Sequence, residues 1–511
     1  LLLSAAAAHA APPFQSLPFL PNVFNKSSSF VNDSEANAAL SRFRKVAGGS
    51  ESLSKRENIL RSLNTVKGRV LGKLRKAPAV KQELLTDLAD RLKGAVFDRP
   101  SVADINKPIA QYLYGGDVML SDDEVARMET GADLHDLGGS LRFKRGAPLV
   151  IVNRWPTTQP IGFTFNSDIN EATRKVIRTA TQKIAANTCL SFRENSNVGT
   201  QLQFHQGGGC WSYIGRQTGA KQLISIDKGC EIVAIASHEI SHALGLDHTQ
   251  DRKDRDAYVT VNTAAVNFDL LNNFAKRTDA QNNNFGVPYE YGSDMHYGAY
   301  DFSNNGQPVL VPSQGEYLNT MGQRKSLTFS DYKLINSLYN CNGKCGNQLT
   351  CQNGGYRSPK NCYSCVCSDF FTGTTCQTPR ITTNLATGGS SQTVFHTDYN
   401  QPLYSSGNDY NWDMFSKDAV RIIRAPAGRK IRVTFNRMYP AFGQLPCYVG
   451  CPFNGVEIVD NAQGDLTTLG KVFCCAKDEG ASFVSQTNVI GYKAFASPGM
   501  PFDATVTYTV V

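Results

Sequence analysis

The sequence lacks several features that would assign it to common protein classes. After its first ten residues, no stretch is long and apolar enough to span a bilayer, so no membrane span is expected. The formal net charge is only +8, and the short Lys/Arg clusters lack interleaved aromatic residues, which argues against nucleic-acid binding. No internal repeat is evident. Residues 11–145 contain no cysteine, and the whole chain has only eight histidines.

The length and the cysteine content indicate a multidomain secreted protein. At 511 residues the chain is too long for one domain, and its apolar content of 41% supports several cores. All fourteen cysteines lie from Cys189 onward, an even number that fits disulfide bonding outside the cell. Residues 1–10 end in A-H-A and are predicted to be a signal peptide remnant; the alternative is an unstructured Ala-rich segment. Asn25 and Asn32 begin glycan acceptor triplets, so a glycoprotein is expected.

Three of the eight histidines fall within eleven residues, H-E-I-S-H-A-L-G-L-D-H from His238 to His248. His238 and His242 are four residues apart, so a helix places both on one face. Gly245 lets that helix end in a left-handed turn, after which His248 is able to approach the same point. Three imidazoles with one open position form a catalytic zinc site, and the full spacing is the metzincin protease pattern. The alternative is a helix with surface histidines.

Glu239 is the expected catalytic general base. It lies beside His238 but about 100° around the helix, so it is near the metal without binding it. In this position it can take a proton from the zinc-activated water and deliver it to the leaving amine. A protease-like binding protein without activity is the competing class, and loss of Glu239 or of a histidine would have favoured it. A structural matrix component would not explain the zinc pattern.

The chain divides at changes in composition. Residues 11–145 are predicted to form a helical propeptide, with helical spacing at 35–46 and 80–94. It ends in the basic quartet Arg142 to Arg145, which predicts cleavage between Arg145 and Gly146 by a furin-like protease; a solvated charge cluster is the alternative. Beyond it we expect a strand closing residues 154–165, a helix at 171–186 and a strand at 189–193.

Two further regions follow residue 341. Residues 342–377 hold six cysteines and too few apolar residues for a core, so disulfides must stabilise them, and spacing alone leaves fifteen pairings open. Residues 378–511 contain short alternating segments, such as 430–435 and 505–511, separated by Gly, Pro and Asn. They are predicted to form a β-sandwich.

Residues 155–341 resemble the astacin family of metzincins. The resemblance rests on G-C-W-S-Y-I-G from Gly209, K-D-R-D from Lys253, the Met-turn S-D-M-H-Y from Ser293 and D-Y-K-L-I-N-S-L-Y-N-C from Asp331. It implies a two-lobed catalytic domain over residues 146–341 with one zinc ion. It also implies that Tyr297 binds the zinc in the resting enzyme and later stabilises the oxyanion. Met295 has no chemistry open to it, so we expect it to form an apolar floor beneath the imidazoles. The implied disulfides are Cys189–Cys341 and Cys210–Cys230.

The last two regions resemble modules that accompany astacins. Residues 342–377 resemble an EGF-like module, which implies the pairs Cys345–Cys362, Cys351–Cys365 and Cys367–Cys376. Residues 378–511 resemble a CUB domain through N-G-V-E-I-V from Asn454 and a late G-Y-K-A-F-A segment. The adjacent Cys474 and Cys475 face Cys447 and Cys451, which suggests two local pairs. The expected fold class is therefore α+β multidomain, in the order of nematode-type astacins with propeptide, EGF-like and CUB domains.

The resemblance extends to the control of activity. Tyr114-Gly115-Gly116-Asp117 resembles the family's F-x-G-D latency motif, with Asp117 as the zinc ligand of the proenzyme. One position departs from the family: Thr249 stands where astacins usually carry a Glu that pairs with the mature N-terminus, so that pairing is in doubt.

Arg324, in the segment M-G-Q-R, resembles the arginine that selects acidic residues just after the scissile bond; a structural ion pair or a solvated surface Arg is the alternative. The sequence as a whole predicts a secreted zinc endopeptidase that is made as a zymogen and acts on extracellular or matrix proteins. The ligands of the EGF-like and CUB modules are not identified by the sequence.

Overall fold

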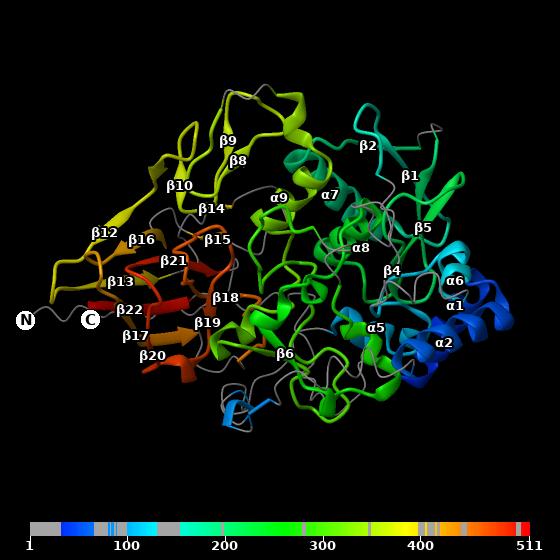
Figure 1. The fold of residues 1–511 in the computed structure, drawn as a ribbon, viewed down its shortest axis with the longest axis horizontal. Helices are drawn as coiled ribbons and strands as arrows, with labels where there is room; N and C mark the ends of the chain where they lie inside the picture. Colours follow the sequence, from blue (N-terminus) through cyan, green and yellow to red (C-terminus); the bar gives the residue numbers. More distant parts are fainter. Residues whose placement is uncertain are drawn as a thin grey trace, which may run out of the picture.

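The computed structural model describes fourteen stretches of the chain. They are residues 32–65, 80–81, 83–85, 88, 100–129, 154–195, 199–277, 283–345, 349–396, 404–405, 414–415, 419–440, 447–496 and 502–511. The predictions for residues 1–10, for Asn25 and for the cleavage site at Arg145 and Gly146 lie outside them. Figure 1 shows three parts in sequence colours: blue N-terminal helices, a green central domain, and a yellow-to-red C-terminal part. The described residues before 130 are called the prosegment below, after the predicted propeptide. None of the helices in the described stretches has the length and apolar character needed to cross a bilayer.

The upper half of the central domain is a five-stranded sheet with two helices. Its strands are β1 (Ile161–Phe165), β2 (Phe192–Glu194), β3 (Gln201–His205), β4 (Cys210–Ser212) and β5 (Lys221–Ile226), and its helices are α7 (Glu171–Asn187) and α8 (Val233–Leu244). The strand order is β2-β1-β3-β5-β4, and β4 runs antiparallel to β5 at the sheet edge. Phe204 and Ile224 are fully buried in the core that this sheet shares with the two helices.

Local sequence explains where the helices begin and end. Helix α7 begins after Asn170, whose side chain accepts a hydrogen bond from the Thr173 amide. Helix α8 ends at Gly245, which adopts φ 103° in the left-handed region. The expected strand and helix at 154–165 and 171–186 are therefore confirmed. The strand expected at 189–193 begins only at Phe192, because Cys189 is held in the disulfide to Cys341 and Thr188 caps the preceding helix with its hydroxyl.

The lower half of the central domain is mostly turns and short helices. The pair β6 (Val259–Val261) and β7 (Leu310–Pro312) and the 3₁₀ helices η6 (Phe268–Phe274) and η7 (Gly315–Asn319) surround a second core. Helix α9 (Phe329–Leu338) instead contributes Ile335 to the first core. Helix α9 begins with a capping box between Thr328 and Asp331. The turn at Ser293 to Tyr297 lies between the two halves.

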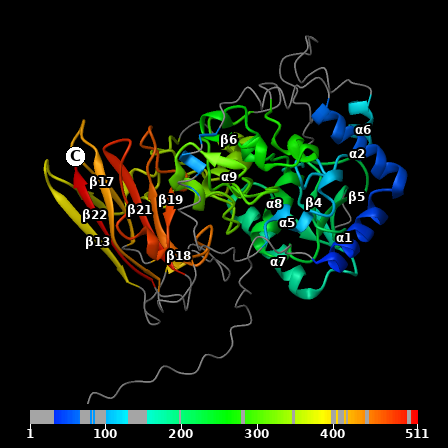
Figure 2. The same cartoon turned by 90° about the horizontal axis from the view of Figure 1, so that it is seen from below.

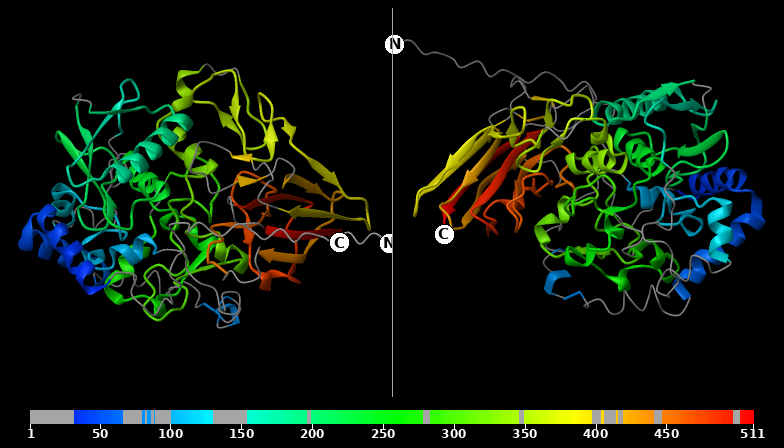
Figure 3. Two further views of the ribbon diagram at one scale, coloured as in Figure 1. Left: turned by 180° about the vertical axis from the view of Figure 1, so that it is seen from behind. Right: turned by 45° about the horizontal axis from the view of Figure 1, so that its top comes forward.

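The prosegment wraps the side of the central domain. Its helices are α1 (Asp33–Val46), α2 (Gly49–Thr65), α5 (Val102–Asn106) and α6 (Asp122–Glu129), with a 3₁₀ turn η2 (Ala110–Tyr112). The dark blue helices α1 and α2 lie along the central domain in both views of Figure 3. Phe43 is fully buried and meets Trp211 of β4 edge to face, with ring centroids 6.0 Å apart. The helix predicted at 35–46 is confirmed, whereas most of 80–94 lies outside the described residues.

The C-terminal part consists of a cysteine-rich segment and a β-sandwich. The cysteine-rich segment carries two short hairpins, β8–β9 (Tyr356–Arg357, Cys365–Val366) and β10–β11 (Phe371–Thr372, Thr378–Pro379). The sandwich has a five-stranded sheet, β12-β16-β21-β18-β19, and a four-stranded sheet, β13-β22-β17-β20, which lie as two layers in Figure 2. A small pair, β14 (Tyr404–Ser405) and β15 (Met414–Phe415), adjoins them.

The sandwich strands are bounded as follows: β12 Thr382–Asn384, β13 Ser390–His396, β16 Val420–Arg424, β17 Ile431–Pro440, β18 Asn454–Val459, β19 Lys471–Phe473, β20 Ser482–Val484, β21 Val489–Ala496 and β22 Phe502–Val510. Strand β22 alternates buried and half-buried residues, as expected for a strand with one face on a core. The β-sandwich expected over the last region is therefore present, with strands at the two predicted positions.

The structure contains seven disulfides and, in its described residues, no free cysteine. Five join the pairs that the family resemblance implies: Cys189–Cys341, Cys210–Cys230, Cys345–Cys362, Cys351–Cys365 and Cys367–Cys376. The other two are Cys447–Cys475 and Cys451–Cys474. The sandwich thus has two local bridges at one end, where the sequence suggested them.

Candidate metal centre

Three imidazoles converge on one carboxylate beside helix α8. The Nε2 atoms of His238 and His248 each lie 3.2 Å from Asp117 Oδ2, and Nε2 of His242 lies 3.5 Å from Asp117 Oδ1. All four side chains are at most 2% exposed. The helix supplies the first two histidines, and the turn at Gly245 returns the chain so that His248 completes the cluster.

Hydrogen bonds on the outer side of the cluster orient two of the rings. His242 Nδ1 donates to the Leu246 carbonyl at 2.9 Å, and His238 Nδ1 lies 2.8 Å from the Asp294 carbonyl. Arg324 Nη1, which is a donor, also lies 2.9 Å from His238 Nδ1. We assign the proton to Nδ1 of His238, because its Nε2 faces the centre of the cluster and the Asp294 carbonyl can only accept. Both rings then present an Nε2 lone pair to that centre.

This donor set fits zinc. Nε2 of His238 and Nε2 of His242 are only 3.1 Å apart, and two lone pairs at that distance need a cation between them. Burial lowers the pKa of His238 and of His248, so both rings favour the neutral form that binds a metal. The backbone carbonyls behind the rings are the outer partners that metal-binding histidines usually have. A carboxylate oxygen of Asp117 lies close enough to the three ring nitrogens to serve as a fourth ligand.

Glu239 lies beside this cluster without contacting it. Its side chain is fully buried, and neither carboxylate oxygen has a hydrogen-bond partner among the described residues. Burial and then the nearby Asp117 carboxylate raise its pKa well above the usual range. A buried carboxyl group without a partner is costly unless a ligand or water uses it. Its role as the general base stays a prediction.

The Met-turn carries two buried residues, Met295 and Tyr297. Met295 is 1% exposed and belongs to the core that also holds Ile240 of α8. The Tyr297 ring centroid lies 4.6 Å from that of His248, and its hydroxyl donates to the Gly115 carbonyl of the prosegment. In this structure the phenol therefore contacts the prosegment.

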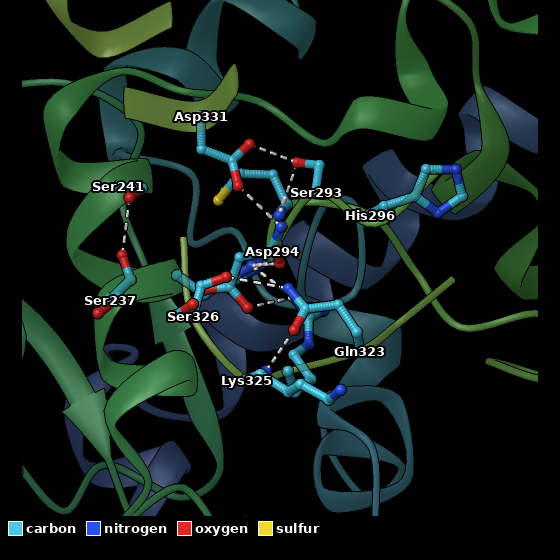
Figure 4. A network of polar contacts seen from close by, with 12 residues as sticks. Ser237, Ser241, Ser293, Asp294, His296, Gln323, Lys325, Ser326 and Asp331 are labelled. Carbon is cyan, nitrogen blue, oxygen red and sulfur yellow. Dashed lines mark hydrogen bonds and ion pairs between the residues drawn. The ribbon is translucent and has the colours of Figure 1, made fainter. Parts of the chain in front are cut away.

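The polar network below the Met-turn is shown in Figure 4. Ser293 Oγ donates to Asp331 Oδ1 at 2.6 Å, and Thr249 Oγ1 donates to Ser293 Oγ at 2.8 Å. The side-chain amide of Gln323 donates to the Gly292 carbonyl at 3.0 Å, which ties the segment before Arg324 to the turn. Thr249, where the sequence departs from the family, thus takes part in a hydroxyl chain that ends on a buried carboxylate.

Arg324 lies between the metal site and a neighbouring cavity. Its Nη1 lies 3.6 Å from Asp294 Oδ1, and its side chain is 8% exposed. This pair is the structural ion pair that the sequence left open as an alternative. Arg324 is also one of the residues that line the cavity beyond the Met-turn.

The two prosegment glycines allow the carboxylate to reach the histidines. Gly115 and Gly116 have φ 58° and 77°, a region that favours glycine. A Cβ on Gly115 would lie 3.2 Å from His248 Nδ1, and one on Gly116 would lie 2.3 Å from the Phe302 ring. Residues with side chains at these positions would push Asp117 away from the cluster.

Two contacts of the prosegment were not foreseen from the sequence. Asn106 accepts from the Cys210 amide at 2.8 Å and donates to the carbonyls of Cys210 and Gly116 at 2.6 and 2.9 Å. Arg277 stacks on the Tyr114 ring, 4.7 Å from its centroid, donates to the Tyr114 hydroxyl and pairs with Asp247. Nothing in the local sequence distinguishes Asn106 or Arg277 from other polar residues.

Comparison with known proteins assigns the catalytic region to a family. The family model of astacin, which describes a family of peptidases, matches residues 150–340. Zinc metalloproteinase nas-28 of Caenorhabditis elegans is 30% identical over 398 residues, which cover 76% of this chain and 77% of that protein. The chain belongs to the astacin family. A second relative, zinc metalloproteinase nas-27 of the same organism, is 30% identical over 75% of this chain and 86% of its own length.

As an astacin, the protein is a zinc metalloproteinase whose catalytic domain has the metzincin fold with mixed helices and sheets, and its histidine cluster fits the catalytic zinc ion of the family. Among solved structures, high choriolytic enzyme 1, a hatching enzyme zinc-protease from Oryzias latipes, is 34% identical. It covers 35% of this chain and 88% of its own, with a TM-score of 0.33.

Proposed function

We propose that the chain is a secreted zinc endopeptidase that is made as an inactive zymogen, with His238, His242 and His248 as zinc ligands. The observation that carries this proposal is the Asp117 carboxylate, which lies within 3.5 Å of all three Nε2 atoms and is 1% exposed. It takes the position that the attacking water needs. The prosegment therefore blocks the site chemically as well as by its bulk.

In the proposed mechanism, the protein side chains hold protons in position and transfer them. Bound zinc would polarise the scissile carbonyl and lower the pKa of a water molecule to about 7. Glu239, whose oxygens lack partners among the described residues, would accept the proton of that water and pass it to the leaving nitrogen. Tyr297 would release the Gly115 carbonyl when the prosegment leaves and donate its hydroxyl to the developing oxyanion.

The substrate backbone would bind along strand β4. This strand is at the edge of its sheet, and the prosegment now occupies that edge. The Ser212 amide donates to the Asp117 carbonyl at 3.0 Å, and the Met119 amide donates to the Ser212 carbonyl at 2.8 Å. An extended peptide adds to a free sheet edge through the same backbone groups. Departure of the prosegment would therefore expose both the zinc ligands and the backbone site.

We further propose five regions for the chain. They are a signal peptide remnant at 1–10, a propeptide at 11–145, an astacin catalytic domain at 146–341, an EGF-like module at 342–377 and a CUB-like domain at 378–511. The Cys-rich hairpins and the two-layered sandwich support the last two assignments. Activation would follow cleavage between Arg145 and Gly146 by a furin-like protease, and the substrates would be extracellular or matrix proteins.

Arg324 is proposed to favour Asp or Glu directly after the scissile bond. Arg324 is one of the residues that line the cavity next to the cluster, and its guanidinium lies beside the buried Asp294 carboxylate. A guanidinium carries several N–H donors in one plane, so a single ion pair at one Nη does not use all of them. A substrate carboxylate would bind the same planar group from the cavity side.

The test compares metal content with hydrolysis of a peptide, on protein cut after Arg145, with and without a chelator. We expect one zinc per chain, hydrolysis that the chelator abolishes and zinc restores, and no hydrolysis by the uncut chain. Cut, zinc-loaded protein that hydrolyses no member of a broad peptide library would contradict the proposed activity.

A further inference from the structure

A cavity beyond Arg324 is built by three separate parts of the chain. The central domain contributes Leu318, Met321 and Arg324, the prosegment contributes Pro100 and Ser101, and the C-terminal sandwich contributes Val449 and Pro452. Because Arg324 also touches the metal-site residue His238, this cavity adjoins the catalytic cleft. The sandwich thus lines the cleft although it begins more than a hundred residues after the zinc ligands in sequence.

The sandwich loop in this cavity is held by both of the disulfides at the end of the sandwich. Cys447 bonds to Cys475, and Cys451 bonds to Cys474, so residues 447–451 are anchored at both ends to the chain that follows β19. Val449 lies between the two anchors and Pro452 follows the second. A short loop closed by two bridges has few conformations, so its side chains keep their place.

The loop is also seated on the central domain. The Gly450 amide donates to Asn319 Oδ1 at 3.5 Å, and Thr320 Oγ1 donates to the Gly470 carbonyl at 2.7 Å. The Lys325 ammonium lies 4.0 Å from the centroid of the Phe495 ring of β21. The first contact involves the loop itself, and the other two join other parts of the sandwich to the residues on either side of Met321 to Arg324.

The prosegment covers one side of this cavity in the zymogen. Pro100 and Ser101 line it, and Ser101 caps helix α5 by accepting from the Asp104 amide at 3.2 Å. Removal of the prosegment takes away this wall and leaves the central domain and the sandwich loop as the remaining two. In the mature enzyme the cavity is therefore a groove that opens toward the substrate.

We infer that the C-terminal sandwich forms, through Val449 and Pro452, a wall of the substrate cleft on the leaving-group side and selects an apolar side chain at the third residue after the scissile bond. This inference rests on the proposed hydrolysis and on the placement of the first residue after the bond at Arg324. In an extended peptide, residues two apart point to the same side. If the first points to Arg324, the third points to the groove lined by Leu318, Met321, Val449 and Pro452.

The experiment uses the activated full-length protein and two peptide series that differ only at this third position, Leu in one and Ser in the other. We expect kcat/KM of the wild type to be about tenfold higher for Leu than for Ser, as is typical of one apolar side chain in an apolar pocket. Val449→Trp should fill the groove and reduce this ratio to below about twofold, while Val449→Gly should enlarge it and shift the preference from Leu to Phe.

Val484→Trp is the matched control, because Val484 lies on β20 of the same sandwich and is 43% exposed. We expect it to keep the wild-type ratio. An unchanged Leu-to-Ser ratio in both Val449 variants, or the same loss in Val484→Trp, would overturn the inference. Peptides that end in an amide directly after the first residue beyond the cut separate the two proposals: their hydrolysis by the wild type tests the proposed activity alone, because they do not reach the groove.

Discussion

The prosegment and the C-terminal sandwich both cover the catalytic domain, but they do so by different physical means. The prosegment shares three apolar cores with the domain: Leu88 enters one, Val102 and Ile105 another, and Phe43 and Ile109 pack with Trp211 in a third. The sandwich has its own core, which contains no residue of 154–341 among those described. Its contacts with the domain include hydrogen bonds that its backbone groups make, such as Gly470 with Thr320 and Leu469 with Glu290.

This difference indicates that the prosegment folds together with the catalytic domain, whereas the sandwich docks on it. The prosegment buries apolar surface with the domain, so its departure would expose Trp211 and its neighbours. The sandwich could fold by itself, because it has a core of its own. The cysteine-rich segment belongs with the sandwich, since Phe370 is buried in the sandwich core against Gly491.

The largest expected effect concerns Glu239, the proposed general base of the central domain. Glu239→Ala should retain about one zinc per chain and lower kcat by about 10³-fold, because a positioned general base contributes 10²- to 10⁴-fold. Metal analysis and peptide turnover of the cut protein would measure both. Ser241→Ala, two residues further along α8, should stay near the wild-type rate; turnover by Glu239→Ala close to that of the wild type would show that another group is the base.

The second prediction concerns the prosegment, which covers the catalytic domain on one side. Asp117→Ala removes the carboxylate that three imidazoles hold, and contacts to charged groups are worth about 1.5–3 kcal/mol each. The uncut variant should therefore hydrolyse peptides about 10²-fold faster than the uncut wild type. Asp122→Ala, on an exposed carboxylate of the same prosegment, is the control. An Asp117→Ala protein that is as inactive as the wild type before cleavage would indicate that bulk alone causes latency.

The third prediction concerns the contact between the sandwich and the catalytic domain, and how it makes stability depend on pH. Glu290 accepts from the Leu469 amide of the sandwich at 2.8 Å, and burial, together with Asp331, raises its pKa from 4.5 to about 8. The folded state favours the protonated acid, so its stabilising contribution is complete below about pH 4.5 and declines as the pH rises toward 8. We expect a loss of about 2 kcal/mol between pH 6 and pH 8.

Thermal unfolding of the full chain at these two pH values would measure this loss. Glu290→Gln should flatten the dependence because an amide does not titrate in this range. An equal decline in the wild type and in Glu290→Gln would assign the pH effect to other groups.

The smallest expected effect concerns Tyr114, and it compares this residue with Asp117 of the same latency motif. Tyr114→Phe removes the hydroxyl that accepts from Arg277 but keeps the ring on which the guanidinium stacks. We expect the prosegment to be held about 1 kcal/mol less tightly, seen as a several-fold weaker inhibition of mature enzyme by the separate prosegment. A loss comparable to that of Asp117→Ala would mean that the Tyr114 hydroxyl, rather than the carboxylate, dominates latency.

The sequence by itself determined the features that depend on local spacing. The i, i+4 histidines and the glycine that ends helix α8 follow from helical geometry, and the Met-turn and Asp117 could be located by their motifs. The strands of the sandwich follow from alternation, although their ends extend beyond the predicted segments: β17 continues to Pro440 rather than ending at residue 435.

Only the tertiary structure decided which distant residues meet. Asn106 reaches Cys210, Arg277 reaches Tyr114, and Val449 lines the same cavity as Arg324, across separations that no local pattern encodes. The structure also decided that Arg324 sits beside Asp294 while lining the cleft, where the sequence left a choice. The physical reason is the same throughout: spacing along the chain specifies the faces of helices and strands, whereas contacts between them depend on how the cores pack.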